Sequence, residues 1–308
     1  MDKASFGKGV IFSVLSYFLW GIFPIYWKLL SVIPNVHILA FRVLLSLPLV
    51  SVILFIQRKT SWLRFYRDRH KAILLTFASL IITFNWGLYI LAVNSGHTVD
   101  TSLGYYINPL ISIAFGLVFF KEKLRTLQAI AFALALAGVT ILTVLTGRLP
   151  LISLGIALSF ALYGLLKKTI DISALESLAV ETLISSPIAL FLLFASFEKG
   201  LDFPAPQALL YWQELPFHVP LLLLLCGAVT ALPLYLFAKS ARLLPLSTLG
   251  FIQFISPTMT FLTGVFIFKE SFPLRNFIAF GFIWSAALLY IISINYSGRK
   301  GTIPQQKA

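Results

Sequence analysis

Two ionisable residues, Arg42 and Glu181, lie inside long apolar stretches of the sequence. Arg42 belongs to FRVLLSLP (41–48) and Glu181 to VETLISSP (180–187), and the two octapeptides align one residue for one. A charge at the centre of a membrane helix costs roughly 2.5–3.5 kcal/mol on insertion scales, so such residues usually face a protein interior or a water-filled path. We therefore expect each to gate such a path or to bind the charged part of what passes through it. Glu181 is also a candidate for proton coupling.

The depths of these two charges follow from counting residues. Arg42 lies near the outer end of its apolar stretch, and Glu181 lies near the inner end of its own. At 1.5 Å per residue in a core of about 30 Å, roughly 10 Å or more separates them along the membrane normal. The count favours roles at opposite mouths over an ion pair. The alternative is that Arg42 reaches outward to lipid headgroups while Glu181 meets Lys167 or Lys168 at the inner surface.

Amide, hydroxyl and aromatic side chains recur on the same apolar stretches. A solute pocket combines apolar and aromatic walls with a few oriented polar groups. Amides can instead simply bridge transmembrane helices. The side chains that we expect to bind a substrate are Asn85, Asn108, Trp20, Tyr163, Trp86, Tyr89, Tyr105, Asn94, Gln253 and Ser256.

Pro109 and Pro257 lie near the middle of their apolar stretches. Proline has no N–H and clashes with the carbonyl four residues earlier, which frees the carbonyls of Tyr105 and Gln253. Freed backbone groups at this depth need a protein or water partner. We expect a helix kink at each proline beside a cavity, although neighbouring helices could satisfy an ordinary kink.

The residue types that carry catalysis do not form a cluster in this sequence. The histidines His37, His70, His97 and His218 have no metal-ligand spacing, and Cys226 is the only cysteine. There is no HExxH sequence, no phosphate-binding GxxxxGK[ST] loop and no GxSxG elbow. We therefore expect no enzyme activity, no cofactor and no metal.

One passage of the sequence is written twice, 148 positions apart. INPLISIAFGLVFFKEKL (107–124) returns as ISPTMTFLTGVFIFKESF (255–272) without a gap. The matched pairs include Pro109 and Pro257, Gly116 and Gly264, Lys121 and Lys269, and Glu122 and Glu270. A repeat of this length indicates two related halves.

The composition requires a membrane. Hydrophobic residues make up 59% of the chain and charged residues only 11%, against about a quarter charged in soluble domains. Apolar blocks of about 20 residues are long enough to cross a bilayer as helices. Ten spans are predicted, near 9–30, 36–57, 72–93, 101–121, 126–146, 150–168, 174–197, 218–238, 246–268 and 275–295.

The repeat divides these spans into two halves of five. We predict a first repeat at 1–148, a second at 149–296 and a tail at 297–308. Because five is odd, the second half must cross the membrane in the opposite sense. The fold class predicted is therefore an all-α integral membrane protein with two inverted five-helix repeats, a plan of secondary transporters that bind substrate between the halves.

The positive charges indicate the orientation and the partners. Placing both termini in the cytoplasm puts 18 of the 24 Lys and Arg residues on the inner side and five on the outer side, with Arg42 inside a span. Lys and Arg favour cytoplasmic loops. The net charge of +13 is thus assigned to membrane lipid and not to nucleic acid. A stripe of Ala129, Ala133 and Ala137, matched by Gly281 and Ser285 in the second half, leaves a homodimer open.

Five stretches of the chain are similar to those of a known family. They are SYFLWGIFPIYWK (16–28), FNWGLYILAVNSGH (84–97), SLGYYINPL (102–110), LISLGIALSFALYGLLKK (151–168) and STLGFIQFISPTMTFL (247–262). They resemble the RarD-like proteins of the EamA family, in the drug/metabolite transporter superfamily, from about residue 10 to residue 295. The resemblance implies a ten-helix carrier of two EamA domains in the bacterial inner membrane, with both termini cytoplasmic. It implies small organic solutes but no particular substrate.

The sequence supports two functional hypotheses. The first is a permease that moves a small organic metabolite or drug-like solute by alternating access between the two repeats. The second is a non-transporting partner or regulatory protein that retains the same fold. A transporter needs a polar cavity near the midplane, whereas a scaffold can fill that space with Leu and Phe.

The orientation can be tested with single cysteines in a chain that lacks Cys226. A cysteine at Ala205 should react with a membrane-impermeant thiol reagent applied from outside intact cells, because the stretch 198–217 is expected to face outward. A cysteine at Ser61, in the basic loop 58–71, should react only after the cells are opened. The reverse pattern would contradict the predicted orientation.

Overall fold

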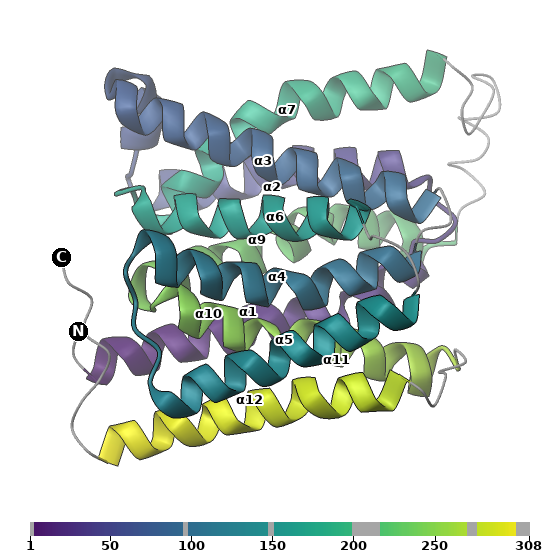
Figure 1. Ribbon diagram of the computed structural model, residues 1–308. Coiled ribbons are helices and arrows are strands. Elements are labelled where there is room, and N and C mark those ends of the chain that lie inside the picture. Colours follow the sequence, from purple (N-terminus) through teal and green to yellow (C-terminus); the bar gives the residue numbers. More distant parts are fainter. Residues whose placement is uncertain (1–2, 95–97, 147–150, 199–215, 270–275, 300–308) are drawn as a thin grey trace.

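The computed structural model describes residues 3–94, 98–146, 151–198, 216–269 and 276–299. All regular structure in these ranges is helical, and the helices lie alongside one another in one bundle (Figure 1). The first half contains α1 (Lys3–Leu29), α2 (Asn35–Ile56), η1 (Ser61–Arg67), α3 (Arg69–Asn94), α4 (Thr98–Phe119) and α5 (Thr126–Thr146). The second half contains α6 (Leu151–Thr169), α7 (Ala174–Glu198), α9 (His218–Leu243), α10 (Leu246–Gln253), α11 (Ile255–Leu262), η2 (Thr263–Ile267) and α12 (Asn276–Arg299).

These helices fit a membrane by length and by surface. Within the described ranges, eight helices are long and apolar enough to cross a bilayer, and the segments Tyr105–Phe119 and Phe277–Ser293 are shorter apolar helices. Large apolar side chains such as Phe55, Phe191 and Leu224 are more than two-thirds exposed. An exposed apolar surface of this extent indicates contact with lipid. The ten-span, all-helical prediction is confirmed.

The first and last helices start and finish at the same end of the bundle. α1 begins and α12 ends there, as the purple and yellow ribbons of Figure 1 show. We call this the termini end, and the other the opposite end. An even number of crossings returns the chain to its starting side, as the sequence predicts.

Contacts between the halves come in related pairs. α1 packs on α9 as α6 packs on α3, and α2 packs on α9 as α7 packs on α3. Similarly, α4 packs on α6 while α1 packs on α10 and α11. The repeat makes α1 the counterpart of α6, α2 of α7, α3 of α9, α4 of the α10–α11 span and α5 of α12. When each helix is exchanged for its counterpart, the first contact of each pair becomes the second. The contacts of α2 with α7, α4 with α10 and α5 with α12 are their own counterparts, so a two-fold axis relates the inverted halves.

Two glycines let the halves approach closely. A Cβ on Gly227 would lie 2.5 Å from the backbone carbonyl of Leu45, where α9 crosses α2. A Cβ on Gly250 would lie 2.7 Å from the carbonyl oxygen of Pro109, where α10 crosses α4. Small residues at such crossings are typical of helix packing in membranes.

The two repeated prolines behave differently. The span with Pro257 is interrupted between α10 and α11 at Phe254 and continues as the π-helical turn η2. α4, by contrast, runs as one helix through Pro109. The sequence treats both positions alike, but an interruption occurs only in the second half.

The repeated Lys-Glu dipeptide has a structural role at the termini end. The lysines of both copies, Lys121 at this end and Lys269 at the opposite end, have a left-handed backbone conformation, with φ of 51° and 58°. The Glu122 carboxylate accepts hydrogen bonds from the backbone N–H groups of Leu246 (2.7 Å) and Ser247 (2.9 Å). It thereby caps the N-terminus of α10, where N–H groups lack partners and negative charge is favoured. In the small-residue stripe predicted on α5, Ala129 and Ala133 are exposed and Ala137 is half-buried.

Candidate functional site

A cavity of about 130 Å³ lies between the two halves. Its walls come from α1, α2, α3 and α4 of the first half and from α6, α10 and α11 of the second. Ten residues singled out from the sequence line it, namely Trp20, Arg42, Asn85, Trp86, Tyr89, Tyr105, Asn108, Gln253, Ser256 and Pro257. Residues that are far apart in sequence are thus brought to one site.

The cavity occupies the half of the bundle away from the termini end. Arg42 and Tyr105 lie about two turns into α2 and α4, which both begin at the opposite end. Tyr89 lies little more than one turn before the end of α3, which finishes there. The lining therefore extends from the middle of the bundle toward the opposite end.

Arg42 projects into an aromatic part of this cavity. Its Nε donates a hydrogen bond to Thr230 Oγ1 at 3.1 Å. Its guanidinium carbon lies 4.8 Å from the ring centroid of Trp27 and 5.1 Å from that of Trp86. Such distances are those of cation–π contacts. The Arg42 side chain therefore faces the cavity between two indole rings.

The amide side chains line the cavity, and two of them also bond a neighbouring helix. Asn85 Nδ2 donates to the Ile156 carbonyl (2.9 Å) and to Ser159 Oγ (2.8 Å), which ties α3 to α6. Asn108 Oδ1 accepts a hydrogen bond from Ser112. Gln253 Oε1 accepts a long one, 3.5 Å, from the Tyr17 hydroxyl. Asn85 and Gln253 thus bond a neighbouring helix while they line the cavity, whereas the Asn108–Ser112 bond lies within α4.

Four aromatic rings form a layer on the termini side of the cavity. We call Tyr17, Phe160, Tyr163 and Phe237 the aromatic floor. Tyr163 stacks on Phe237 with ring centroids 5.9 Å apart, and Phe160 lies 5.4 Å from Phe237 and 6.0 Å from Tyr163. Tyr17 meets Phe237 edge-on at 6.2 Å. Tyr163 is therefore part of the floor. The sequence predicts it as a pocket residue, but it is not among the residues that line the cavity.

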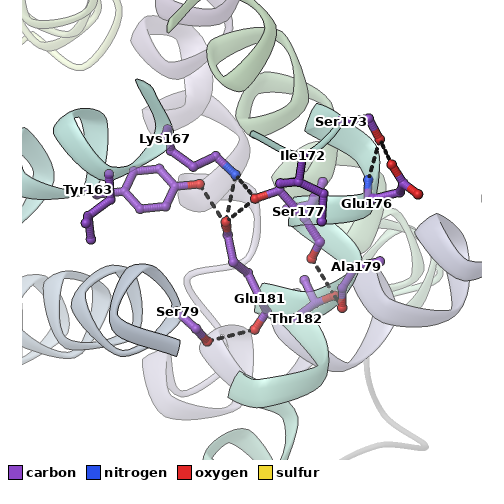
Figure 2. Close-up of polar contacts among 12 residues, drawn as sticks. Ser79, Tyr163, Lys167, Ile172, Ser173, Glu176, Ser177, Ala179, Glu181 and Thr182 are labelled. Atoms are coloured by element: carbon purple, nitrogen blue, oxygen red, sulfur yellow. Dashed lines mark hydrogen bonds and ion pairs between the residues drawn. The ribbon is translucent and has the colours of Figure 1, made fainter. Parts of the chain in front are cut away.

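Glu181 lies beyond this floor, in a buried polar network (Figure 2). Its Oε1 is 2.6 Å from Lys167 Nζ, and both side chains are only 3% exposed. The Tyr163 hydroxyl donates to Glu181 Oε2 at 2.9 Å, and Ser177 Oγ donates to Oε1 at 2.7 Å. Ser79 of α3 donates to the Glu181 backbone carbonyl at 2.9 Å. Glu181 thus joins α6, α7 and α3, away from the cavity.

The buried position of Glu181 differs from the sequence-based expectation, which places this residue at the inner mouth of the pathway. The ion pair with Lys167 is the partner named in the alternative interpretation, but the pair is buried and does not lie at a surface. Burial of two charges is tolerated only when they are paired and hydrogen-bonded. The pairing depends on how α6 and α7 are placed by their packing on α3 and α9, which residue counting along one helix does not include.

Further polar contacts close the bundle at the termini end. Arg242 of α9 donates to the Ile172 carbonyl (2.7 Å) and to Asp171 (3.1 Å). Lys168 donates to the Leu244 carbonyl. Together with the Glu122 cap on α10, these contacts hold the ends of α6, α9 and α10 together. These contacts lie on the termini side of the cavity.

The structure adds residues that the sequence analysis missed. Trp27, Phe160 and Thr260 line the cavity, and Tyr17 lies in the floor and also contacts the cavity. Trp27 follows Trp20 by seven positions, a spacing that puts both on one helix face. That spacing could have identified Trp27. Asn94 belongs to α3, but its side chain lies outside the described residues.

An all-helical bundle of two inverted halves around a polar cavity defines the transporter class of membrane proteins. Comparison with known proteins agrees. The model of the EamA-like transporter family matches residues 7–144 and 149–292, and the chain belongs to this family. It is therefore a membrane transporter of the drug/metabolite superfamily and a multi-pass protein of the bacterial inner membrane.

Individual relatives cover nearly the whole chain. The "Uncharacterized transporter YojE" of Bacillus subtilis (strain 168) is 41% identical, over 95% of this chain and 96% of its own. "Protein RarD" of Escherichia coli (strain K12) is 37% identical, over 97% and 99%. One crystal structure of a protein, 15% identical, has a TM-score of 0.69 and covers 91% of this chain and 96% of its own. At that identity it supports the fold alone.

The buried ion pair predicts a non-additive mutant cycle. Lys167→Met leaves the Glu181 carboxylate buried without its cation, which should lower the free energy of unfolding by about 3–5 kcal/mol. Adding Glu181→Gln to the same chain should restore most of this loss. The measurement is unfolding of the purified protein in detergent, followed by circular dichroism.

Arg242→Met supplies the control for this cycle. It breaks the exposed pair with Asp171 and should cost less than about 1 kcal/mol. If the double variant is as unstable as the sum of Lys167→Met and Glu181→Gln, the two side chains do not act as a pair.

Proposed function

We propose that this protein is a secondary transporter of a small organic solute, with the cavity between the halves as its solute site. The single observation that carries the proposal is the chemistry of the cavity wall. A guanidinium, three amides and several aromatic rings converge there from both inverted halves. A few oriented polar groups among aromatic walls are typical of small-molecule sites.

The alternative function, a scaffold that retains the fold, fits this wall poorly. A scaffold has no reason to keep polar side chains at the centre of a bundle, where each needs a partner. Space of this kind could be filled by Leu or Phe with a gain in packing. The relatives named as transporters support the same choice.

Alternating access supplies the mechanism that we propose. The floor and the polar contacts at the termini end separate the cavity from that side. Because the halves are related by a two-fold axis, the helices that meet at the termini end have counterparts that can meet at the opposite end.

The proposed orientation follows from the charges. The termini end carries the basic segment 58–71 and most other Lys and Arg residues, so it is assigned to the cytoplasm. The arrangement described above is then closed to the cytoplasm. The domain limits at 148 and 296, the absence of enzyme activity and the homodimer stay predictions.

Glu181 is the residue that we propose to couple the closed end to a proton. Its carboxylate holds Lys167, Tyr163 and Ser177 directly behind the floor. Opening this end requires α6 and α7 to move, which strains those contacts. Protonation removes the negative charge that holds Lys167, and it therefore favours the open arrangement. The coupling acts through the floor and does not require Glu181 to touch the solute.

Transport assays test this role. Proteoliposomes with the protein should take up or exchange components of an isotope-labelled bacterial metabolite extract that protein-free liposomes do not. Glu181→Gln should remove the dependence of that transport on a pH gradient, because the side chain can no longer exchange a proton. Glu176→Gln, which changes a half-buried carboxylate on the same helix that hydrogen-bonds Ser173 and not the Glu181 network, should keep it.

Two outcomes would contradict the proposal. Identical metabolite profiles with and without the protein would remove the transport function. An unchanged response of Glu181→Gln to the pH gradient, at wild-type protein levels, would remove the coupling role of Glu181 and leave transport intact.

A further inference from the structure

We propose that Arg42 makes this cavity selective for organic anions, specifically a carboxylate on a compact, planar apolar body. The inference rests on the proposed transport function and names the substrate class of the same cavity. Three observations carry it: the charge balance around Arg42, the free donors of its guanidinium, and the aromatic surfaces beside it.

The charge of Arg42 has no counter-ion among the described residues. No described carboxylate lies within 4 Å of it, and the buried carboxylate of Glu181 is already paired with Lys167. The groups that interact with Arg42 electrostatically are the phenols of Tyr26, Tyr89 and Tyr105 and the thiol of Cys226. Phenols and thiols are neutral near pH 7, with reference pKa values of about 10 and 8.5. The described cavity wall therefore carries one positive charge.

The donors of the guanidinium are only partly used. Nε donates to Thr230, whereas no acceptor for the two Nη groups is found among the residues that the structure describes. The indole rings of Trp27 and Trp86 contact the guanidinium but accept no strong hydrogen bond from it. A guanidinium fork with free Nη groups matches the two oxygens of a carboxylate.

The remaining walls fit an aromatic or other flat apolar body. Tyr89 and Tyr105 lie with ring centroids 6.1 Å apart, and Trp20 lies on the same cavity beside Phe160 at 5.4 Å. Stacked or edge-on aromatic contacts favour planar ligands. The volume of about 130 Å³ is below the roughly 300–1,000 Å³ of drug-sized sites, so the solute is compact.

An amine of the same shape should be excluded. Its positive charge would lie next to Arg42 in a site with little water to screen the repulsion. A neutral amide would keep the apolar contacts but would leave the guanidinium without a counter-ion. The charge of the ligand therefore determines the order of affinity among the carboxylate, the amide and the amine. The apolar body contributes equally to the binding of all three.

The test uses four probes that share a phenyl ring. Phenylacetate, phenylacetamide and phenethylamine are matched in size and differ in charge, and phenyl phosphate separates a carboxylate site from a phosphate site. Binding to the full-length protein in detergent is measured by isothermal titration calorimetry. Phenylacetate should bind about tenfold or more tightly than phenylacetamide, and phenethylamine should not bind measurably.

Variants of Arg42 assign the preference to its charge. Arg42→Gln should remove the difference between phenylacetate and phenylacetamide, and Arg42→Lys should retain part of it because a point charge lacks the fork. Arg67→Gln, which removes an exposed arginine of the basic segment 58–71, should bind all four probes as the wild type does. Circular dichroism on each variant shows that it is folded, and an unfolded Arg42→Gln is replaced by Arg42→Met.

Several results would overturn the inference. They are equal binding of phenylacetate and phenylacetamide, tighter binding of phenethylamine, absence of binding by all four probes, and a preference that survives in Arg42→Gln. Tighter binding of phenyl phosphate than of phenylacetate would overturn the assignment to carboxylates. If these results occur while proteoliposomes still transport metabolites, the anion selectivity fails and the transport function stands.

Discussion

Hydrocarbon offers no hydrogen-bond partner, and this constraint determines where every polar group of the chain can lie. Backbone groups are satisfied within helices, and charged side chains must meet one another, water or a ligand. Glu181 and Lys167 meet each other at 2.6 Å in a buried network. Arg42 meets two indole rings and a hydroxyl, in a cavity between the halves. The two buried charges are thus stabilised differently. The Glu181–Lys167 pair ties helices together, whereas Arg42 is left able to bind a ligand in the cavity.

The inverted repeat explains why these two solutions lie at corresponding positions. Arg42 of α2 and Glu181 of α7 are counterparts, and α2 packs on α7 across the two-fold axis. Equivalent positions in the two halves have therefore acquired different tasks. One faces the cavity away from the termini end, and the other lies behind the aromatic floor toward that end. The two halves thus have the same fold but opposite charges at these equivalent positions, which gives the two ends of the pathway different chemistry.

Much of this arrangement can be predicted from the sequence. The ten spans follow from apolar stretches of about 20 residues, and the inverted halves follow from a gap-free repeat with an odd number of spans. Most of the cavity lining follows as well, because Asn85, Asn108 and Gln253 are costly in an apolar helix unless they face other protein groups or a cavity. These residues are polar within apolar stretches, and this contrast can be seen in the sequence alone.

The remainder depends on packing between helices. The position of Tyr163 in the floor, and not in the cavity, is set by its stacking on Phe237 from α9. The Lys167–Glu181 pair depends on how α6 and α7 each pack on α3 and α9, and residue counting supplies only depth. Pro109 lies within one continuous helix and the span of Pro257 is interrupted, although the repeat makes the two positions equivalent. Local signals cannot contain these facts, because each requires two segments placed together.

The central claim is that one cavity opens to the two sides of the membrane in turn. Ser256→Cys, in a Cys226→Ala background, places a single thiol in the cavity wall. The measurement is its rate of reaction with a membrane-impermeant thiol reagent, applied from each side of oriented vesicles, with and without a metabolite extract. The account predicts reaction from both sides, with the extract changing the two rates in opposite directions. Reaction from one side only under every condition, or from neither, would contradict it.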